Sequence, residues 1–185
     1  RNAAVSGRDT STTVVMLGDY IDRGPSSRRV LEILMEEKKR RRMVTLAGNH
    51  EEMMREFLDG SDPGRVARFI LNGGSTTLAD YADDDGAWVI PAEHARFLDE
   101  LHLWHETDDY FFVHAGVPDR SLKELDRTRD RDEMLWIRRQ FITNPRKWEK
   151  RIVHGHTPVN AVELSATRIN VDTACAYGGF LTAIE

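Results

Sequence analysis

Short apolar runs alternate with amphipathic segments along the first half of the chain. Residues 13–17 form a β-branched apolar run typical of a buried strand. Residues 26–42 then place apolar side chains at the 3.6-residue period of a helix, and residues 43–47 return to the strand pattern. A helix is expected to follow through Leu58, and three more are predicted at residues 65–71, 75–82 and 91–101.

The second half of the chain is richer in predicted strands. A hairpin is expected over residues 103–107 and 110–114 with Asp108 and Asp109 at its turn, and a helix over residues 132–141. Short strands are predicted after this helix, at residues 151–153, near Glu163, at 168–171 and at 180–184. Strands interspersed with helices, followed by a strand-rich end, indicate a layered α/β fold. A length of 185 residues fits a single domain.

Composition and charge narrow the functional classes. The net charge of −5 argues against general nucleic-acid binding, which requires a basic face. No apolar run approaches the roughly 18 residues of a membrane span, so no membrane association is expected. The only cysteine, Cys175, has no internal disulfide partner, which makes a reducing, cytoplasmic location the expectation. The sequence does not indicate an oligomeric state.

Side chains of the metal-ligand type follow four of the predicted strands. Asp19 follows the first strand, Asn49 and His50 the second, and His114 and His156 two later ones. Each has an ordinary explanation when taken alone, because strand-end aspartate or asparagine often caps a turn or helix. Four strand ends with this chemistry in one chain favour a metal centre. Mixed oxygen and nitrogen donors suit manganese, iron, zinc or nickel better than calcium.

These residues lie in four short motifs that are spread along the chain: GDYIDRG (18–24), GNHE (48–51), HAG (114–116) and GHTP (155–158). The motifs resemble those of the calcineurin-like metallophosphoesterases, and more narrowly the bacterial and phage branch of the PPP-type serine/threonine protein phosphatases. Three further segments fit that branch: NGG (72–74), LWIR (135–138) and DTACAYGG (172–179). The resemblance covers nearly the whole chain and implies a layered metallophosphoesterase fold, with two central mixed β-sheets flanked by helices.

The resemblance also implies a metal-ligand set. Asp19 would bridge two divalent ions, and Asn49, His114 and His156 would complete the second of them. Manganese is the expected metal, with iron, zinc or nickel as alternatives. His154, two residues before His156, is interpreted as a structural residue at the end of a strand rather than as a ligand.

Four other residues acquire catalytic roles from the same resemblance. His50 would be the general acid, and Asp22 would keep it protonated, because a neighbouring carboxylate favours the imidazolium form. Arg23 and Arg138 would hold the phosphate oxygens, for which the planar guanidinium is suited. Arg139 is adjacent to Arg138, and helical neighbours point about 100° apart, so only one of the two is expected to reach the site.

The implied reaction is hydrolysis of phosphoserine or phosphothreonine in proteins, by direct attack of a metal-bridging hydroxide on phosphorus. A phosphoprotein or phosphopeptide would therefore be the partner. Two alternatives stay open: a symmetrical diadenosine tetraphosphate hydrolase, and a catalytically dead module that recognises phosphate. The second aspartate of GDYIDRG, Asp22, and the glutamate after His50, Glu51, favour the protein phosphatase.

One family motif has no match in this sequence. The family begins with a strand that ends in G-D-x-H-G, whose aspartate and histidine bind the first metal. We therefore expect the N-terminal strand to be missing, so that residues 1–185 form a single domain truncated ahead of Arg1 and poorly active alone. A natural pseudoenzyme is the alternative, but the catalytic set retained at Asp22, His50 and Arg138 favours a lost segment.

Overall fold

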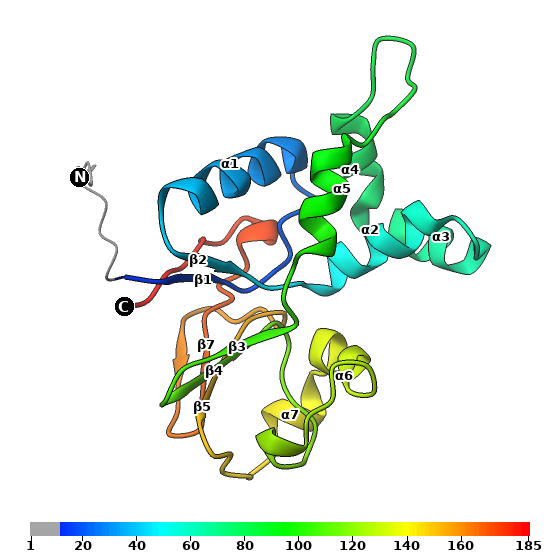
Figure 1. Cartoon of the computed structure of the whole chain (residues 1–185). Coiled ribbons are helices and arrows are strands. Elements are labelled where there is room, and N and C mark those ends of the chain that lie inside the picture. Colours follow the sequence, from blue (N-terminus) through cyan, green and yellow to red (C-terminus); the bar gives the residue numbers. More distant parts are fainter. Residues whose placement is uncertain (1–11) are drawn as a thin grey trace.

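The computed structural model describes residues 12–185, and its first half consists of helices around a small parallel sheet. Strand β1 (Val14–Met16) pairs in parallel with β2 (Met43–Thr45), and α1 (Ser27–Arg40) connects them. Four further helices follow β2: α2 (Asn49–Asp59), α3 (Pro63–Phe69), α4 (Ser75–Asp80) and α5 (Ala92–Asp99). Figure 1 shows α1, α4 and α5 on one side of β1 and β2, with the strands and helices of residues 104–170 on the other.

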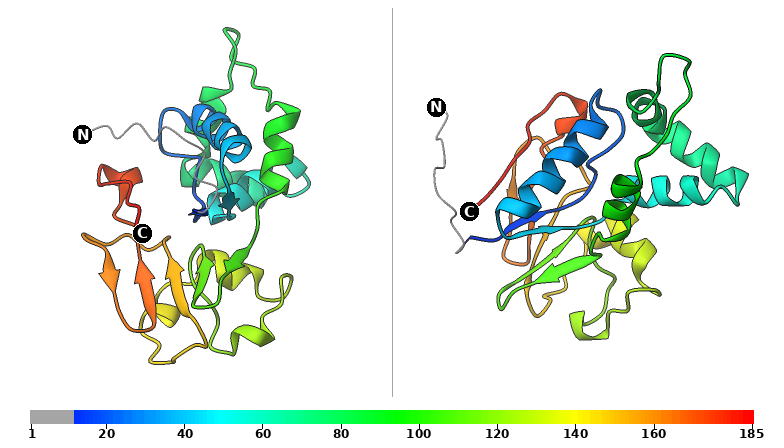
Figure 2. Two further views of the ribbon diagram at one scale, coloured as in Figure 1. Left: turned by 60° about the vertical axis from the view of Figure 1, so that its left-hand side comes forward. Right: turned by 45° about the horizontal axis from the view of Figure 1, so that its top comes forward.

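The second half contains a five-stranded mixed sheet with the order β3-β4-β5-β7-β6. The predicted hairpin is confirmed, because β3 (Trp104–Glu106) pairs antiparallel with β4 (Tyr110–Val113). Strands β4, β5 (Arg151–His154) and β7 (Arg168–Asn170) run in parallel, and β6 (Glu163–Leu164) closes the far edge antiparallel to β7. Figure 2 (left) shows this sheet below the helices of the first half. The prediction of a layered α/β fold is therefore confirmed.

The helix predicted over residues 132–141 is wrong in one respect, because it is broken into two short helices. Helix α6 (Arg131–Trp136) ends where Ile137 adopts an extended conformation, and α7 (Arg139–Ile142) begins after Arg138. The break allows Ile137 to pack into the core of this half, beside Gly116. Tertiary packing thus outweighs the helical periodicity of the sequence at this point.

The strand predicted at residues 180–184 is also wrong. Phe180 makes isolated bridges to Thr173 and Ala174, and residues 181–184 pair with no strand in the described part of the chain. Phe180 and Leu181 are 79% and 82% exposed, so their apolar side chains contribute little to a core. An apolar pattern predicts a strand only where a neighbouring edge is available for pairing.

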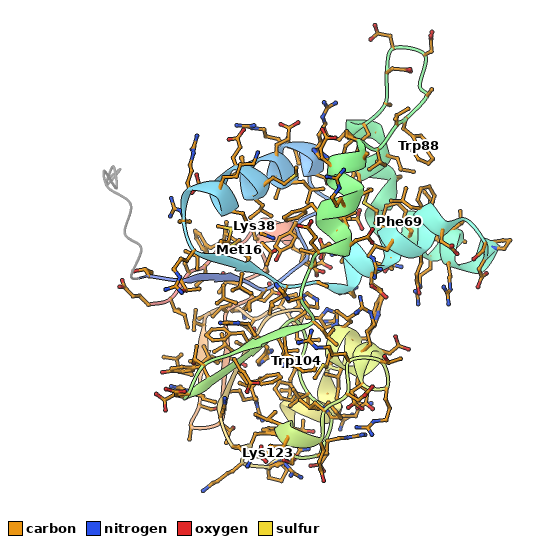
Figure 3. All side chains as sticks on the ribbon, in the orientation of Figure 1. Met16, Lys38, Phe69, Trp88, Trp104 and Lys123 are labelled. Atoms are coloured by element: carbon orange, nitrogen blue, oxygen red, sulfur yellow. The ribbon has the colours of Figure 1, made fainter. Side chains whose placement is uncertain are left out.

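Two hydrophobic cores lie on either side of the junction between the halves. One packs α1, α2 and α5 around Leu31, Met53 and Phe69, and the other packs the larger sheet around Phe111 and Phe141. Figure 3 places Phe69 and Trp88 among the helices and Trp104 beside the larger sheet. Among the described residues, no helix is both long and apolar enough to cross a membrane.

Candidate functional site

The ends of four strands meet at the junction between the two halves. Asp19 follows β1, Asn49 begins α2 after the short loop that follows β2, and His114 and His156 follow β4 and β5. Asp19 and His156 have positive φ angles of 57° and 64°, which are unusual for residues other than glycine. Strained backbone of this kind collects at functional sites, where the surrounding structure holds it in place.

Three of the predicted ligands form a compact cluster. One carboxylate oxygen of Asp19 and one ring nitrogen each of His114 and His156 lie within 4.8 Å of one another. The Nδ1 of His114 lies 2.7 Å from the Leu17 carbonyl, to which it must donate, so Nε2 is the nitrogen left to act as a metal ligand. This Nε2 faces Asn49 Oδ1 at 3.0 Å and Asp19 Oδ1 at 3.4 Å. These three electron-rich atoms face one another, which is the arrangement expected around a bound cation.

The pKa shifts of Asp19 and His156 also fit a metal. Burial, together with His114 and Arg138 nearby, lowers the pKa of His156 to about 3, so its ring is neutral as a metal ligand must be. Burial alone would raise the pKa of Asp19, but the neighbouring His114 and His50 outweigh it and lower the pKa. A carboxylate, an amide oxygen and two imidazoles form a donor set suited to a divalent transition metal.

His50 and Asp22 form a buried pair beside this cluster. His50 Nδ1 lies 2.6 Å from Asp22 Oδ2, and the two side chains are 2% and 0% exposed. Burial lowers the pKa of His50, but the hydrogen bond to Asp22 and the charge of Asp19 outweigh this effect and raise the pKa above its ordinary value. The Thr77 hydroxyl donates to the other oxygen of Asp22 at 2.6 Å and fixes the carboxylate.

Both predicted phosphate-binding arginines are exposed at the rim of the cluster. Arg138 Nη1 donates to the His156 carbonyl at 2.7 Å, and the break between α6 and α7 turns this side chain toward the site. The Arg23 guanidinium lies 5.4 Å from the centre of the Tyr177 ring. Gly73 has a φ of 106°, and a Cβ there would lie 2.9 Å from Arg23 Cγ, so the glycine leaves room for the arginine.

Sequence reasoning missed the structural role of Glu51. This fully buried carboxylate accepts three backbone N–H bonds, from Asp19 at 2.8 Å, Tyr20 at 2.6 Å and Gly48 at 2.8 Å, and so joins the loops after β1 and β2. Burial and the charge of Asp19 raise the pKa of Glu51 to about 7. A glutamate three residues after an N-cap is a capping-box signal, which predicts the bond to Gly48 but not those to the more distant loop.

His154 lies outside the cluster. Its ring meets the Phe141 ring edge-on, with centroids 5.0 Å apart, and its Nδ1 lies 3.2 Å from the Gly155 carbonyl. Burial lowers the pKa of His154 to about 4. The ring therefore packs as a neutral side chain against the core of the larger sheet.

The fold and the donor cluster define an α/β protein with a candidate metal centre at the ends of its strands. The chain belongs to the calcineurin-like phosphoesterase family, whose model matches residues 5–180, and the resemblance seen in the motifs is confirmed. The chain is 30% identical to an asymmetrical bis(5'-nucleosyl)-tetraphosphatase, PrpE, of Geobacillus thermodenitrificans, over 91% of this chain and 73% of the relative.

Another relative is serine/threonine-protein phosphatase 1 of Salmonella typhimurium, which is also 30% identical, over 91% of this chain and 76% of the relative. A solved metallophosphoesterase from Sphaerobacter thermophilus is 20% identical, with a TM-score of 0.47 over 84% of this chain and 63% of that structure.

Proposed function

We propose that the protein is a metal-dependent phosphatase that hydrolyses phosphoserine and phosphothreonine in proteins. The observation that carries this proposal is the buried His50–Asp22 pair, which lies beside the Asp19 cluster and retains a raised His50 pKa. A protonated histidine next to a metal cluster supplies the general acid that a poor leaving group such as a serine alkoxide requires.

In this proposal the site holds two divalent ions, with manganese as the preferred metal. Asp19 would be a ligand of both ions, and Asn49, His114 and His156 would be the other ligands of the second one. The ions, when bound, acidify a water molecule and neutralise the charge that develops on the phosphate. The bond from His114 Nδ1 to the Leu17 carbonyl fixes the ring, so that Nε2 points into the cluster.

The remaining residues handle the proton and the phosphate. Asp22 holds His50 Nδ1, so the proton on Nε2 is the one available to the leaving oxygen. Arg23 and Arg138 bind the non-bridging phosphate oxygens through charge-assisted hydrogen bonds. Both arginines are exposed, which suits a phosphorylated side chain presented on the surface of a partner protein. We place this reaction in the cytoplasm.

Hydrolysis of bis(5'-nucleosyl)-tetraphosphate is a second candidate, because the PrpE relatives are named for this reaction. We expect the purified protein, assayed with manganese, to give a higher kcat/KM for a phosphothreonine peptide than for diadenosine tetraphosphate. Phosphate release and chromatography of the nucleotide products measure the two reactions. A higher kcat/KM for the tetraphosphate would favour the second candidate, and turnover of neither substrate would favour a module that only recognises phosphate.

Replacing Arg138 with alanine should raise the KM for a phosphopeptide by about 10-fold or more, because hydrogen bonds to a charged group contribute about 1.5–3 kcal/mol. Arg139→Ala is the matched control, since Arg139 is also exposed and directly adjacent. Steady-state kinetics of both variants measure the effect. Equal increases in KM would remove Arg138 from its proposed role.

A further inference from the structure

Two glutamates on one face of α2 bind arginines, one of which belongs to α6 and one of which contacts it. Glu52 accepts two parallel bonds from Arg131, the first residue of α6, with Oε1 2.9 Å from Nε and Oε2 2.6 Å from Nη2. Glu56, one turn later, pairs with Arg68 of α3. The Arg68 guanidinium lies 5.5 Å from the centre of the Trp136 ring, at the other end of α6. Helix α6 is therefore held at both ends from the α2 side.

The two helices carry different parts of the candidate site. Helix α2 begins with Asn49 and His50, whereas Arg138 follows two residues after the end of α6. The Trp136 ring also meets the metal-cluster histidine His156 edge-on, with centroids 6.1 Å apart. In Figure 1, α2 and α6 face each other across the junction between the two halves. Contacts between these helices therefore link the placement of Arg138 to that of His50.

The geometry of the Glu52–Arg131 pair favours a positioning role over a general contribution to stability. Exposed ion pairs contribute little to stability, because salt and side-chain entropy offset their attraction. This pair differs in that both oxygens are engaged by the guanidinium fork, which fixes direction as well as distance. The side chains of Glu52 and Arg131 are only 17% and 29% exposed. Arg55 Nη1 also pairs with Glu52 Oε2, at 3.0 Å, the oxygen that Arg131 Nη2 contacts.

We infer that Glu52 and Arg131 are positioning residues that set the placement of α6 against α2 and thereby hold Arg138 at the phosphate position. The inference rests on the proposed phosphatase function for its kinetic consequence, but not for its structural one. Neither residue touches the reacting atoms, so both act through Arg138. Because a displacement of about 1 Å can cost ~10²-fold in rate, loss of the pair should be visible in substrate kinetics.

The experiment compares Glu52→Gln, Arg131→Gln and the double variant with wild-type protein. Glu37→Gln is the matched control, because Glu37 is 22% exposed and also pairs with two arginines, Arg40 at 3.3 Å and Arg41 at 2.6 Å, away from α6. Each single variant should raise the KM for a phosphopeptide about 10-fold with a smaller change in kcat. The double variant should raise the KM no further than the worse of the two single variants, because the two residues act as a unit.

Hydrogen exchange of backbone amides provides a readout that does not depend on activity. Residues 131–138 should exchange faster in Glu52→Gln while α1 is unchanged, and Glu37→Gln should leave residues 131–138 as in wild type. Unchanged exchange at residues 131–138 in Glu52→Gln overturns the inference, and so does faster exchange with an unchanged KM. An equal rise in KM in the Glu37→Gln control also overturns it. If wild-type protein hydrolyses no phosphoester, the proposed function fails, and exchange at residues 131–138 then decides whether the pair positions α6.

Discussion

Replacing His50 with asparagine should lower the turnover of a phosphothreonine peptide by about 10²–10⁴-fold, the usual contribution of general acid–base catalysis. The asparagine amide can still donate to Asp22, which lies 2.6 Å from His50 Nδ1 in the wild type, so the local packing is preserved. Asparagine has no counterpart of the histidine Nε2, from which a proton could reach the leaving oxygen. Steady-state kinetics at saturating manganese measure the loss, and calorimetry should show little change in manganese affinity.

The choice of leaving group separates this role from a general disturbance of the site. The p-nitrophenolate group needs little protonation as it leaves, so His50→Asn should lose much less activity on p-nitrophenyl phosphate than on the peptide. His102→Asn is a suitable control, because His102 is exposed and its backbone rather than its ring joins β2 to the second half. An equal loss on both substrates would argue against His50 as the general acid.

The periodicity of the sequence predicted most of the fold because most elements are local. The β1–α1–β2 unit and the β3–β4 hairpin follow from apolar spacing within a few residues. The break at Ile137 does not, because it depends on Gly116 and on the core of the larger sheet. The failed strand at residues 180–184 has the same origin, since pairing is decided by the neighbouring edge and not by the segment itself.

The candidate site shows the same division between local and distant causes. Ligand-type residues at the ends of strands favoured a metal centre, and Asp19, His114 and His156 do cluster. The sequence did not show that they would come from two different sheets, with Asp19 after β1 and the histidines after β4 and β5. The residues that support the site are joined across long stretches of chain. Thr77 bonds to Asp22 from 55 positions away, and Arg131 bonds to Glu52 from 79 positions away. Spacing in a single sequence contains no signal for either pair.

Removing divalent ions should abolish activity, and manganese should restore it, if the Asp19 cluster is the catalytic metal centre. The matched comparison is His114→Ala against His154→Ala, because both histidines are buried to 2% exposure and follow or end neighbouring strands of the larger sheet. Only His114 turns its Nε2 toward Asp19 and Asn49, whereas His154 packs against Phe141.

His114→Ala should therefore weaken manganese binding by more than ~100-fold, the upper end of the loss seen when only an outer-shell partner of a ligand is removed. His154→Ala should keep the metal content of the wild type and lower its melting temperature instead, because it leaves a cavity beside Phe141. Elemental analysis after dialysis measures the metal content, and thermal unfolding measures stability. Full activity in excess chelator, or equal metal loss in both variants, would show that the catalytic ions are bound elsewhere.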